Sequence, residues 1–136
     1  MPTAIQPVIA AEGGALRFGD YTVKEKQKKD GFEFGGETYS VKTHDLVTRL
    51  ERGGILAVET VPGTAVSGYR ADADSVVFEA EGTGDTQITL GLAQSATYEL
   101  FSDGESMGMT KTNRSGKAIF SVDLSEGSKK IEARLI

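Results

Sequence analysis

The sequence contains no cysteine and no tryptophan, and it has one histidine and three prolines in 136 residues. The absence of cysteine excludes disulfides and thiolate metal sites. A Ser-His-Asp arrangement would depend entirely on His44, and the G-x-S-x-G motif of many serine hydrolases is missing. Asp45 is adjacent to His44, but neighbouring side chains of a strand point to opposite faces. We therefore expect His44 to lie on the surface or in a turn, and we predict no catalytic residue.

Positive charge and long apolar runs are also scarce. Fifteen lysines and arginines stand against twenty acidic residues, which gives a net charge of −5 and disfavours nucleic acid as a partner. No stretch approaches the roughly 18 apolar residues of a membrane-spanning helix, so no membrane insertion is expected. Residues 1–14 have no basic segment, and Pro7 interrupts their apolar run, so we expect a soluble chain without a signal peptide. Its compartment stays open.

The sequence does have seventeen glycines, most of them between short runs rich in β-branched and aromatic residues. Within these runs apolar residues recur at every second position, most clearly from Ala118 to Leu124 near the C-terminus. Such a pattern places one face of each strand in a core. It predicts one all-β domain over residues 1–136, an antiparallel β-sandwich of about nine or ten strands with at most one short helix.

Several elements can be placed in advance. A first strand is expected over residues 4–10, at a sheet edge because Pro7 lacks an N–H. Gly35-Gly36 predicts a hairpin. Residues 45–52 fit either a helix or, as we favour, the first arm of a hairpin that turns at Gly53-Gly54. Pro62-Gly63 predicts a type II turn that carries the chain into a new pairing.

The expected core consists of the apolar residues in these alternating runs. They are Leu16, Phe18, Val41, Leu56, Val58, Phe78, Ile88, Leu90, Tyr98, Leu100, Phe120, Val122, Ile131 and Ala133.

A candidate ligand site lies at the turn that contains Asp72 and Asp74. Two carboxylates in this D-x-D arrangement could hold calcium, a cation that prefers oxygen ligands, and Asp85 or Glu81 could add to them. The alternative is an ordinary solvated turn, since aspartate is common in turns without metal. No other cofactor is expected.

Aromatic side chains could add a stacking surface for a sugar. Tyr39, Tyr69 and Phe101 are the rings best placed to face solvent, but core packing is favoured for each of them. Tyr69 lies close in sequence to Asp72 and Asp74, so these three residues form the predicted ligand-binding patch.

The last forty residues contain the segments YELFSDG, TNRSGK and SVDLSEG. This stretch resembles the end of immunoglobulin-like and related β-sandwich modules in bacterial carbohydrate-active enzymes and surface proteins. The resemblance implies a non-catalytic accessory module that packs on a protein domain or binds a glycan. The absence of tryptophan departs from the usual sugar-stacking pattern.

Three functions follow from the sequence. The first is a non-catalytic accessory or binding module, with a protein domain or a glycan as its partner. The second is a small structural subunit that oligomerises through a strand edge or a sheet face, or packs on a partner protein. The third is a glycan-acting hydrolase with paired carboxylates. The sequence does not specify an oligomeric state.

Overall fold

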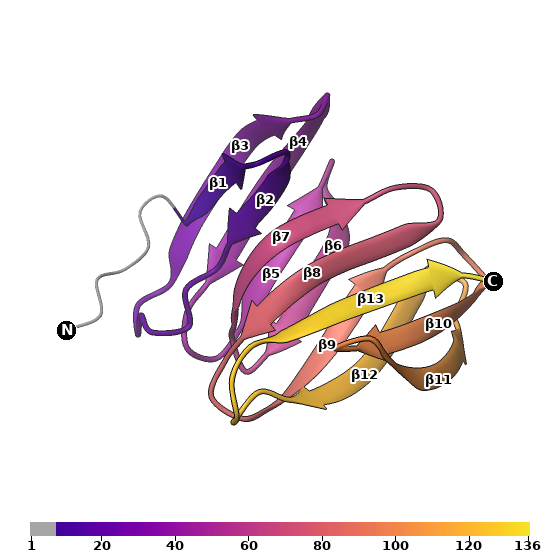
Figure 1. Ribbon diagram of the computed structural model, residues 1–136. Coiled ribbons are helices and arrows are strands. Elements are labelled where there is room, and N and C mark those ends of the chain that lie inside the picture. Colours follow the sequence, from indigo (N-terminus) through magenta and orange to yellow (C-terminus); the bar gives the residue numbers. More distant parts are fainter. Residues whose placement is uncertain (1–7) are drawn as a thin grey trace.

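A computed structural model describes residues 8–136 and shows thirteen strands and no helix in that part of the chain. All strand pairs are antiparallel, and the strands form one seven-stranded and one six-stranded sheet (Figure 1). The predicted antiparallel β-sandwich is confirmed. It has more strands than predicted, because each short arm between two glycine turns pairs as a separate strand.

The first sheet, sheet A, has seven strands. In spatial order they are β1 (Ile9–Glu12), β2 (Ala15–Phe18), β7 (Ala65–Ala71), β8 (Ser75–Glu81), β13 (Lys129–Leu135), β10 (Thr97–Ser102) and β11 (Glu105–Lys111).

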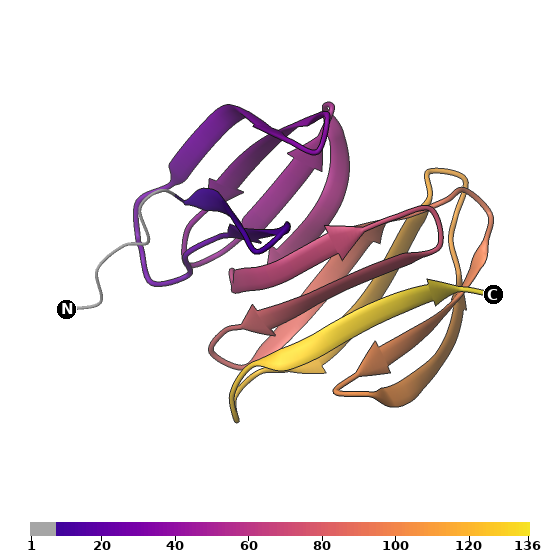
Figure 2. The ribbon, with the colours of Figure 1, turned by 45° about the horizontal axis from the view of Figure 1, so that its top comes forward.

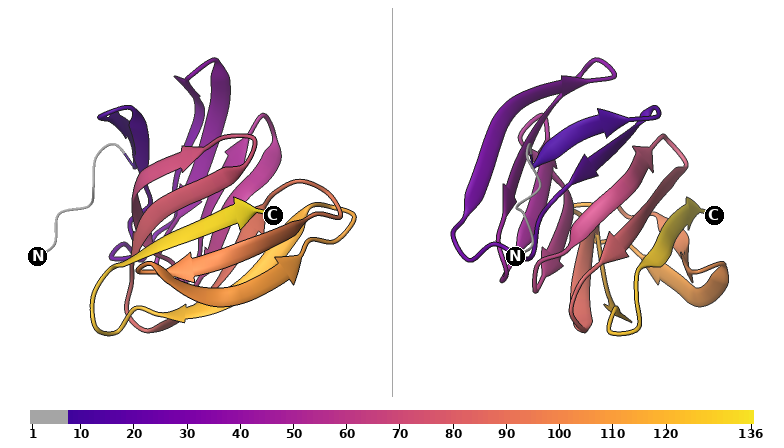
Figure 3. Two further views of the ribbon diagram at one scale, coloured as in Figure 1. Left: turned by 45° about the vertical axis from the view of Figure 1, so that its right-hand side comes forward. Right: turned by 60° about the vertical axis from the view of Figure 1, so that its left-hand side comes forward.

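The second sheet, sheet B, has six strands. In spatial order they are β12 (Lys117–Asp123), β9 (Asp85–Gly91), β6 (Ile55–Val61), β5 (Thr48–Arg52), β4 (Glu37–Thr43) and β3 (Gln27–Phe34). Figures 2 and 3 show the two sheets as separate layers that cross at an angle.

The side chains between the two layers form the hydrophobic core. All the residues expected there are buried except Phe120, which is half-buried because β12 is an edge strand. Phe18, Phe78 and Ile131 are among the largest side chains that are fully enclosed. The period-two pattern therefore identified the inward faces correctly.

Glycine pairs form the hairpin turns that the sequence indicated. Gly35-Gly36 joins β3 to β4 and Gly53-Gly54 joins β5 to β6, and all four glycines have positive φ. The helix considered for residues 45–52 is wrong, because Thr48–Arg52 pairs with β6 instead. Most of the strand expected over residues 4–10 lies outside the described residues, and β1 begins at Ile9.

The Pro62-Gly63 prediction is half right. The chain does pass here from β6 in sheet B to β7 in sheet A. The type II geometry is wrong, since Gly63 does not have the positive φ that this turn requires. The Val61–Pro62 peptide bond is cis. A Cβ on residue 63 would lie 2.2 Å from the carbonyl oxygen of His44, so close backbone approach explains the glycine.

Buried threonines connect the loops at this end of the sandwich. Thr48 Oγ1 lies 2.8 Å from Thr43 Oγ1, donates to the carbonyl oxygen of Thr64 at 2.8 Å and accepts the Thr64 N–H at 3.1 Å. Thr43 Oγ1 also accepts the N–H of Asp20 at 2.9 Å. These bonds satisfy polar groups that burial would otherwise leave without water.

None of the residues 8–136 belongs to a helix long and apolar enough to cross a bilayer.

Candidate functional site

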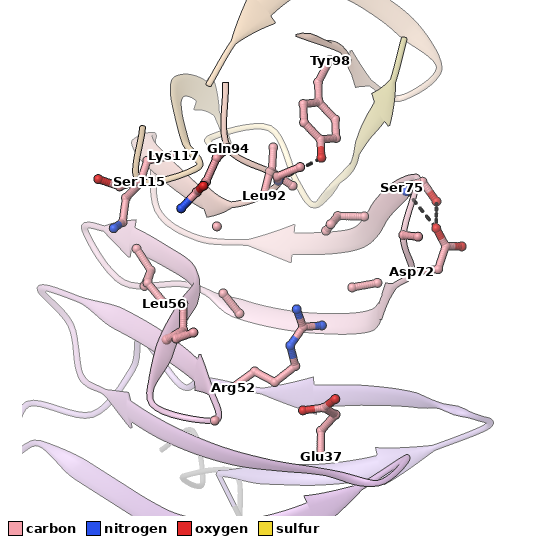
Figure 4. A pocket seen from close by; sticks show the side chains of 18 of the residues that line it. Glu37, Arg52, Leu56, Asp72, Ser75, Leu92, Gln94, Tyr98, Ser115 and Lys117 are labelled. Carbon is pink, nitrogen blue, oxygen red and sulfur yellow. Dashed lines mark hydrogen bonds between the residues drawn. The ribbon is translucent and has the colours of Figure 1, made fainter. Parts of the chain in front are cut away.

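A cleft of about 670 Å³ opens between the sheets at the end of the sandwich opposite the threonines. We call it the end cleft. Its walls come from the β5–β6 and β7–β8 turns and from the loops that follow β9 and β11 (Figure 4). Loops at one end of a rigid sandwich are a common place for recognition.

The apolar part of the cleft continues the core. Leu56, Ala57, Val76 and Tyr98 are buried side chains that also line it. Leu56 and Ala57 are consecutive and both buried, because the β5–β6 register shifts between Leu50 and Glu51 and makes Ala57 a bulge residue. Such a bulge re-aims side chains at a strand end.

Charged and polar side chains surround this apolar floor. Arg52 and Glu37 come from neighbouring strands of sheet B, while Asp72 lies at the β7–β8 turn. Gln94 and Lys117 come from the opposite side of the cleft, as Figure 4 shows. The charged groups include both signs, so the cleft offers hydrogen-bond donors and acceptors without a strong net charge.

Arg52 projects into the cleft because of its place in β5. It pairs with Tyr39 of β4, whose side chain is buried, and it alternates with the buried Thr48 and Leu50. The inner face of β5 therefore ends in a charged residue at the mouth of the cleft.

Tyr69 lines the cleft, but its ring is not solvent-exposed as the predicted ligand-binding patch requires. The residue is 3% exposed, and its ring lies 5.8 Å from Phe18 in an edge-on arrangement and 6.3 Å from Phe78. Burial raises the pKa of the Tyr69 hydroxyl to about 12, and the charge of Arg52 acts in the opposite direction. Tyr69 is therefore a core residue whose edge borders the cleft.

A β-bulge explains this error. Two residues of β7, Gly68 and Tyr69, lie opposite Phe78 alone, and Gly68 has a φ of +63°. The extra residue shifts the alternation by one, so Tyr69 joins Val66 on the inner face.

The other two rings named as candidates for the surface differ from each other. Tyr39 is buried, as the favoured core packing predicts. Phe101 is half-buried on the outer face of sheet A, where the Arg134 guanidinium lies 4.7 Å from the centre of its ring.

Asp72 is exposed at the cleft, and one of its oxygens shapes the turn. Asp72 Oδ1 accepts the N–H groups of Asp74 and Ser75, each at 2.8 Å, and these bonds lower the pKa of the carboxyl group. Asp74 follows in the same turn but is not among the residues that line the cleft. The structure thus places Tyr69 and Asp72 on one cleft and leaves Asp74 beside it.

The predicted calcium site gains no further carboxylate. Glu81 and Asp85 lie at the other end of β8, a strand of seven residues, and so are far from Asp72. Within residues 8–136 no three histidine, cysteine or acidic side chains gather closely enough to form an evident metal site. Calcium at Asp72 and Asp74 stays a prediction.

Hydrogen bonds hold the loop after β9 in place. The hydroxyl group of Tyr98 accepts the Ala93 N–H at 3.0 Å, and Thr112 Oγ1 accepts the Ala96 N–H at 2.9 Å. A Cβ on Gly116 would lie 2.2 Å from the carbonyl oxygen of Leu92, so the two loops pack directly on each other. This wall of the cleft is pre-formed.

His44 lies in the loop before β5, in agreement with the expected turn position. Its Nδ1 lies 3.3 Å from Asp45 Oδ1, so the assumption that the two side chains point apart was wrong, since neither residue belongs to a strand. Among the described residues no serine hydroxyl bonds to the ring, and the loop is remote from the end cleft.

Sequence reasoning missed Glu37, Arg52, Gln94 and Lys117. Each is a single polar residue next to a glycine turn or a loop, which is an ordinary surface pattern. Only the pairing of distant strands brings them together.

Comparisons with known protein families, with curated proteins and with solved structures found no match to this chain.

Proposed function

We propose that this chain is a non-catalytic binding module and that the end cleft binds a glycan. The observation that carries the proposal is the composition of the cleft, an apolar floor with Leu56 and Tyr98 inside a rim of polar groups such as Arg52 and Gln94. A sugar presents C–H groups on its faces and hydroxyl groups at its edge, so it requires both kinds of surface.

The rigidity of the cleft supports binding. The Asp72 turn and the loop after β9 are fixed by the hydrogen bonds described above. A pre-formed site loses less conformational entropy when it binds than a flexible one does. The resemblance of the C-terminal segments to accessory modules of carbohydrate-active and surface proteins agrees with this function.

The carboxylates of the cleft favour binding over hydrolysis. A glycosidase requires a general acid whose pKa is raised, next to a second carboxylate. The pKa of Asp72 is lowered instead by the N–H groups of its turn. Glu37 lines the same cleft, so Glu37→Gln is the informative variant if hydrolysis of chromogenic glycosides is observed.

The test is calorimetric titration with a panel of soluble polysaccharides. We expect Arg52→Ala to weaken binding at least about tenfold, because Arg52 offers charge-assisted hydrogen bonds inside the cleft. Arg49→Ala is the matched control, since it removes an arginine from the outer face of the same strand, where it pairs with Glu51 and Glu59. Absence of binding by the wild-type protein, or equal losses in both variants, contradicts the proposal.

Calcium enters the same experiment as a separate arm. Asp72→Asn keeps an oxygen that can accept the turn hydrogen bonds but removes the charge that a cation needs. We expect calcium to bind the wild-type protein and not this variant. Identical calcium heats for both proteins would remove Asp72 as a ligand while leaving the glycan proposal intact.

A further inference from the structure

The two sheets end in four edge strands, β1, β3, β11 and β12. An exposed edge presents backbone donors and acceptors to other chains, and proteins usually shorten, bend or charge such edges. Three of these four strands show such features. β1 has only four residues, and both β3 and β11 contain register shifts next to glycines with positive φ, Gly31 and Gly108.

Strand β12 is neither short nor bent, and its charged residues stand only at its two ends, Lys117 and Asp123. Its seven residues pair with β9 in unbroken register, from Lys117 opposite Gly91 to Asp123 opposite Asp85. The strand contains no proline, and Ile119 near its centre is 57% exposed. Phe120 is half-buried, because β12 is the last strand of sheet B among residues 8–136.

A hollow with a mixed polar and apolar lining lies beside this edge. Figures 1 and 3 show β11 and β12 next to each other where both sheets end. This hollow of about 370 Å³ lies between them, and Met107 of β11 and Val122 of β12 line it together with polar and charged residues of both strands and of the β10–β11 turn. Met107 is 39% exposed. The side of the sandwich that contains β12 is therefore open and partly apolar.

The sequence of β12 is complementary to itself. If two copies pair antiparallel about Phe120, Lys117 of each copy lies opposite Asp123 of the other, and Ile119 lies opposite Ser121. The two copies of Ile119 then become diagonal neighbours on the outer face, within reach of each other. Opposite charges at both ends and apolar contact in the middle fix both the direction and the register.

The charges within one chain also favour pairing with a second copy. Asp123 already lies opposite Asp85, and like charges at opposed positions are unfavourable. Lys117 of a second copy would place a positive charge next to Asp123, on the side of β12 that faces away from β9, and would reduce this repulsion. Asp123 is held in place by its Oδ1, which accepts the Ser125 N–H at 2.9 Å.

We propose that this protein forms a two-fold symmetric dimer in which the β12 strands of two copies pair antiparallel about Phe120. Sheet B then runs through both subunits as one sheet of twice its six strands. The contact is isologous and closes on itself, so it gives a dimer and not a filament. Lys117 also lines the end cleft, so the oligomeric state is measured without a glycan, and Asp123→Lys tests the contact from a residue outside that cleft.

Sedimentation velocity at micromolar concentrations provides the first test. We expect the wild-type protein to have twice the 14.4 kDa mass of one chain. In Lys117→Asp and in Asp123→Lys, both charge pairs of the symmetric dimer become repulsive. Each variant should dissociate with a constant roughly tenfold higher or more, since cross-strand charge pairs are worth up to about 1 kcal/mol each and all of them are reversed.

The decisive step is to mix the two single variants. A dimer of Lys117→Asp with Asp123→Lys has two attractive pairs again, with the negative residues on one chain and the positive residues on the other. We expect the mixture to form dimers at the concentrations at which the wild-type protein does, although each variant alone is monomeric there. Circular dichroism of each variant shows that the fold is retained, and Lys111→Asp on edge strand β11 is the matched control that should stay dimeric.

Three results would overturn the proposal. They are a wild-type monomer at concentrations of several hundred micromolar, a dimer that tolerates both charge reversals, and single variants that stay monomeric after mixing. Dissociation by Lys111→Asp alone would assign the contact to β11 instead.

Discussion

The ring of Tyr69 packs against Phe18 and Phe78, although the predicted ligand-binding patch requires it at the surface. Gly68 causes the difference, because its φ of +63° accommodates an extra residue in β7. A single bulge residue thus moved a predicted ligand-stacking ring into the core. Tyr69 still lines the end cleft.

The first stability prediction concerns Tyr69 itself. We expect Tyr69→Ala to lower the free energy of unfolding by about 3–5 kcal/mol, because it leaves a cavity between two aromatic rings. Urea denaturation monitored by circular dichroism measures this value. Phe101→Ala is the control, since Phe101 is half-buried under Arg134 on the outer face and its loss should cost only about 1 kcal/mol. Equal losses in both variants would contradict the assignment of Tyr69 to the core.

This result also constrains how the cleft is tested. A substitution that unfolds part of the core cannot report on a ligand. Arg52 and Gln94 are exposed and can be replaced with little effect on the core, whereas Tyr69 should be changed only to phenylalanine.

The structural elements themselves are held together by polar contacts as well as by the core. Strands β4, β5 and β7 begin or end at the threonine cluster, where Thr48 bonds to Thr43 and to both backbone groups of Thr64. The cluster therefore links strands β4 and β5 of sheet B to the start of strand β7 in sheet A. Gly19 packs on it so closely that a Cβ would lie 2.6 Å from the carbonyl oxygen of Thr64.

We expect Thr48→Val to reduce the free energy of unfolding by roughly 2–4 kcal/mol. Valine has nearly the same shape, but it leaves the Thr64 N–H and the Thr43 hydroxyl without this partner in a buried site. Chemical denaturation of Thr38→Val provides the comparison. Thr38 is exposed on β4, so its replacement should change stability by less than about 0.5 kcal/mol. A Thr48→Val protein as stable as this control would show that the cluster contributes little.

At the scale of the whole molecule, two tyrosines make the free energy of unfolding depend on pH in the alkaline range. The Tyr21 hydroxyl donates to Glu81 Oε2 at 2.7 Å, and this bond raises its pKa from 10.0 to about 12. Burial raises the pKa of Tyr69 to about 12 as well. The fold favours the neutral form of both groups.

The sign of the effect follows from linkage. Because both pKa values are higher in the folded protein, the stabilisation is fully present below pH 10 and is lost as pH rises toward about 12. We expect the free energy of unfolding to fall over this interval, and the fall to be smaller in Tyr21→Phe and Tyr69→Phe. Spectrophotometric titration of the tyrosines supplies the pKa values independently. The same pH dependence in wild type and both variants would contradict this account.

The fold class and much of the core follow from local sequence. Alternation such as Ile88 and Leu90 in β9 fixes which side chains face inward, and glycine pairs such as Gly53-Gly54 fix where hairpins turn. Both are properties of a few neighbouring residues, so they can be predicted before any pairing is known. The location of a turn at Asp72 was predictable for the same reason.

The end cleft depended on tertiary structure. Arg52 and Lys117 stand at strand ends, and Asp72 and Gln94 lie in loops far from them in the chain. They meet only because sheet A and sheet B stack with these ends together. The face of β7 on which Tyr69 lies was likewise set by strand pairing, because a bulge is defined by two strands and not by one. The sequence alone therefore determined the period of each strand, and the packing of the two sheets decided which residues share a site, since local patterns carry no information about distant partners.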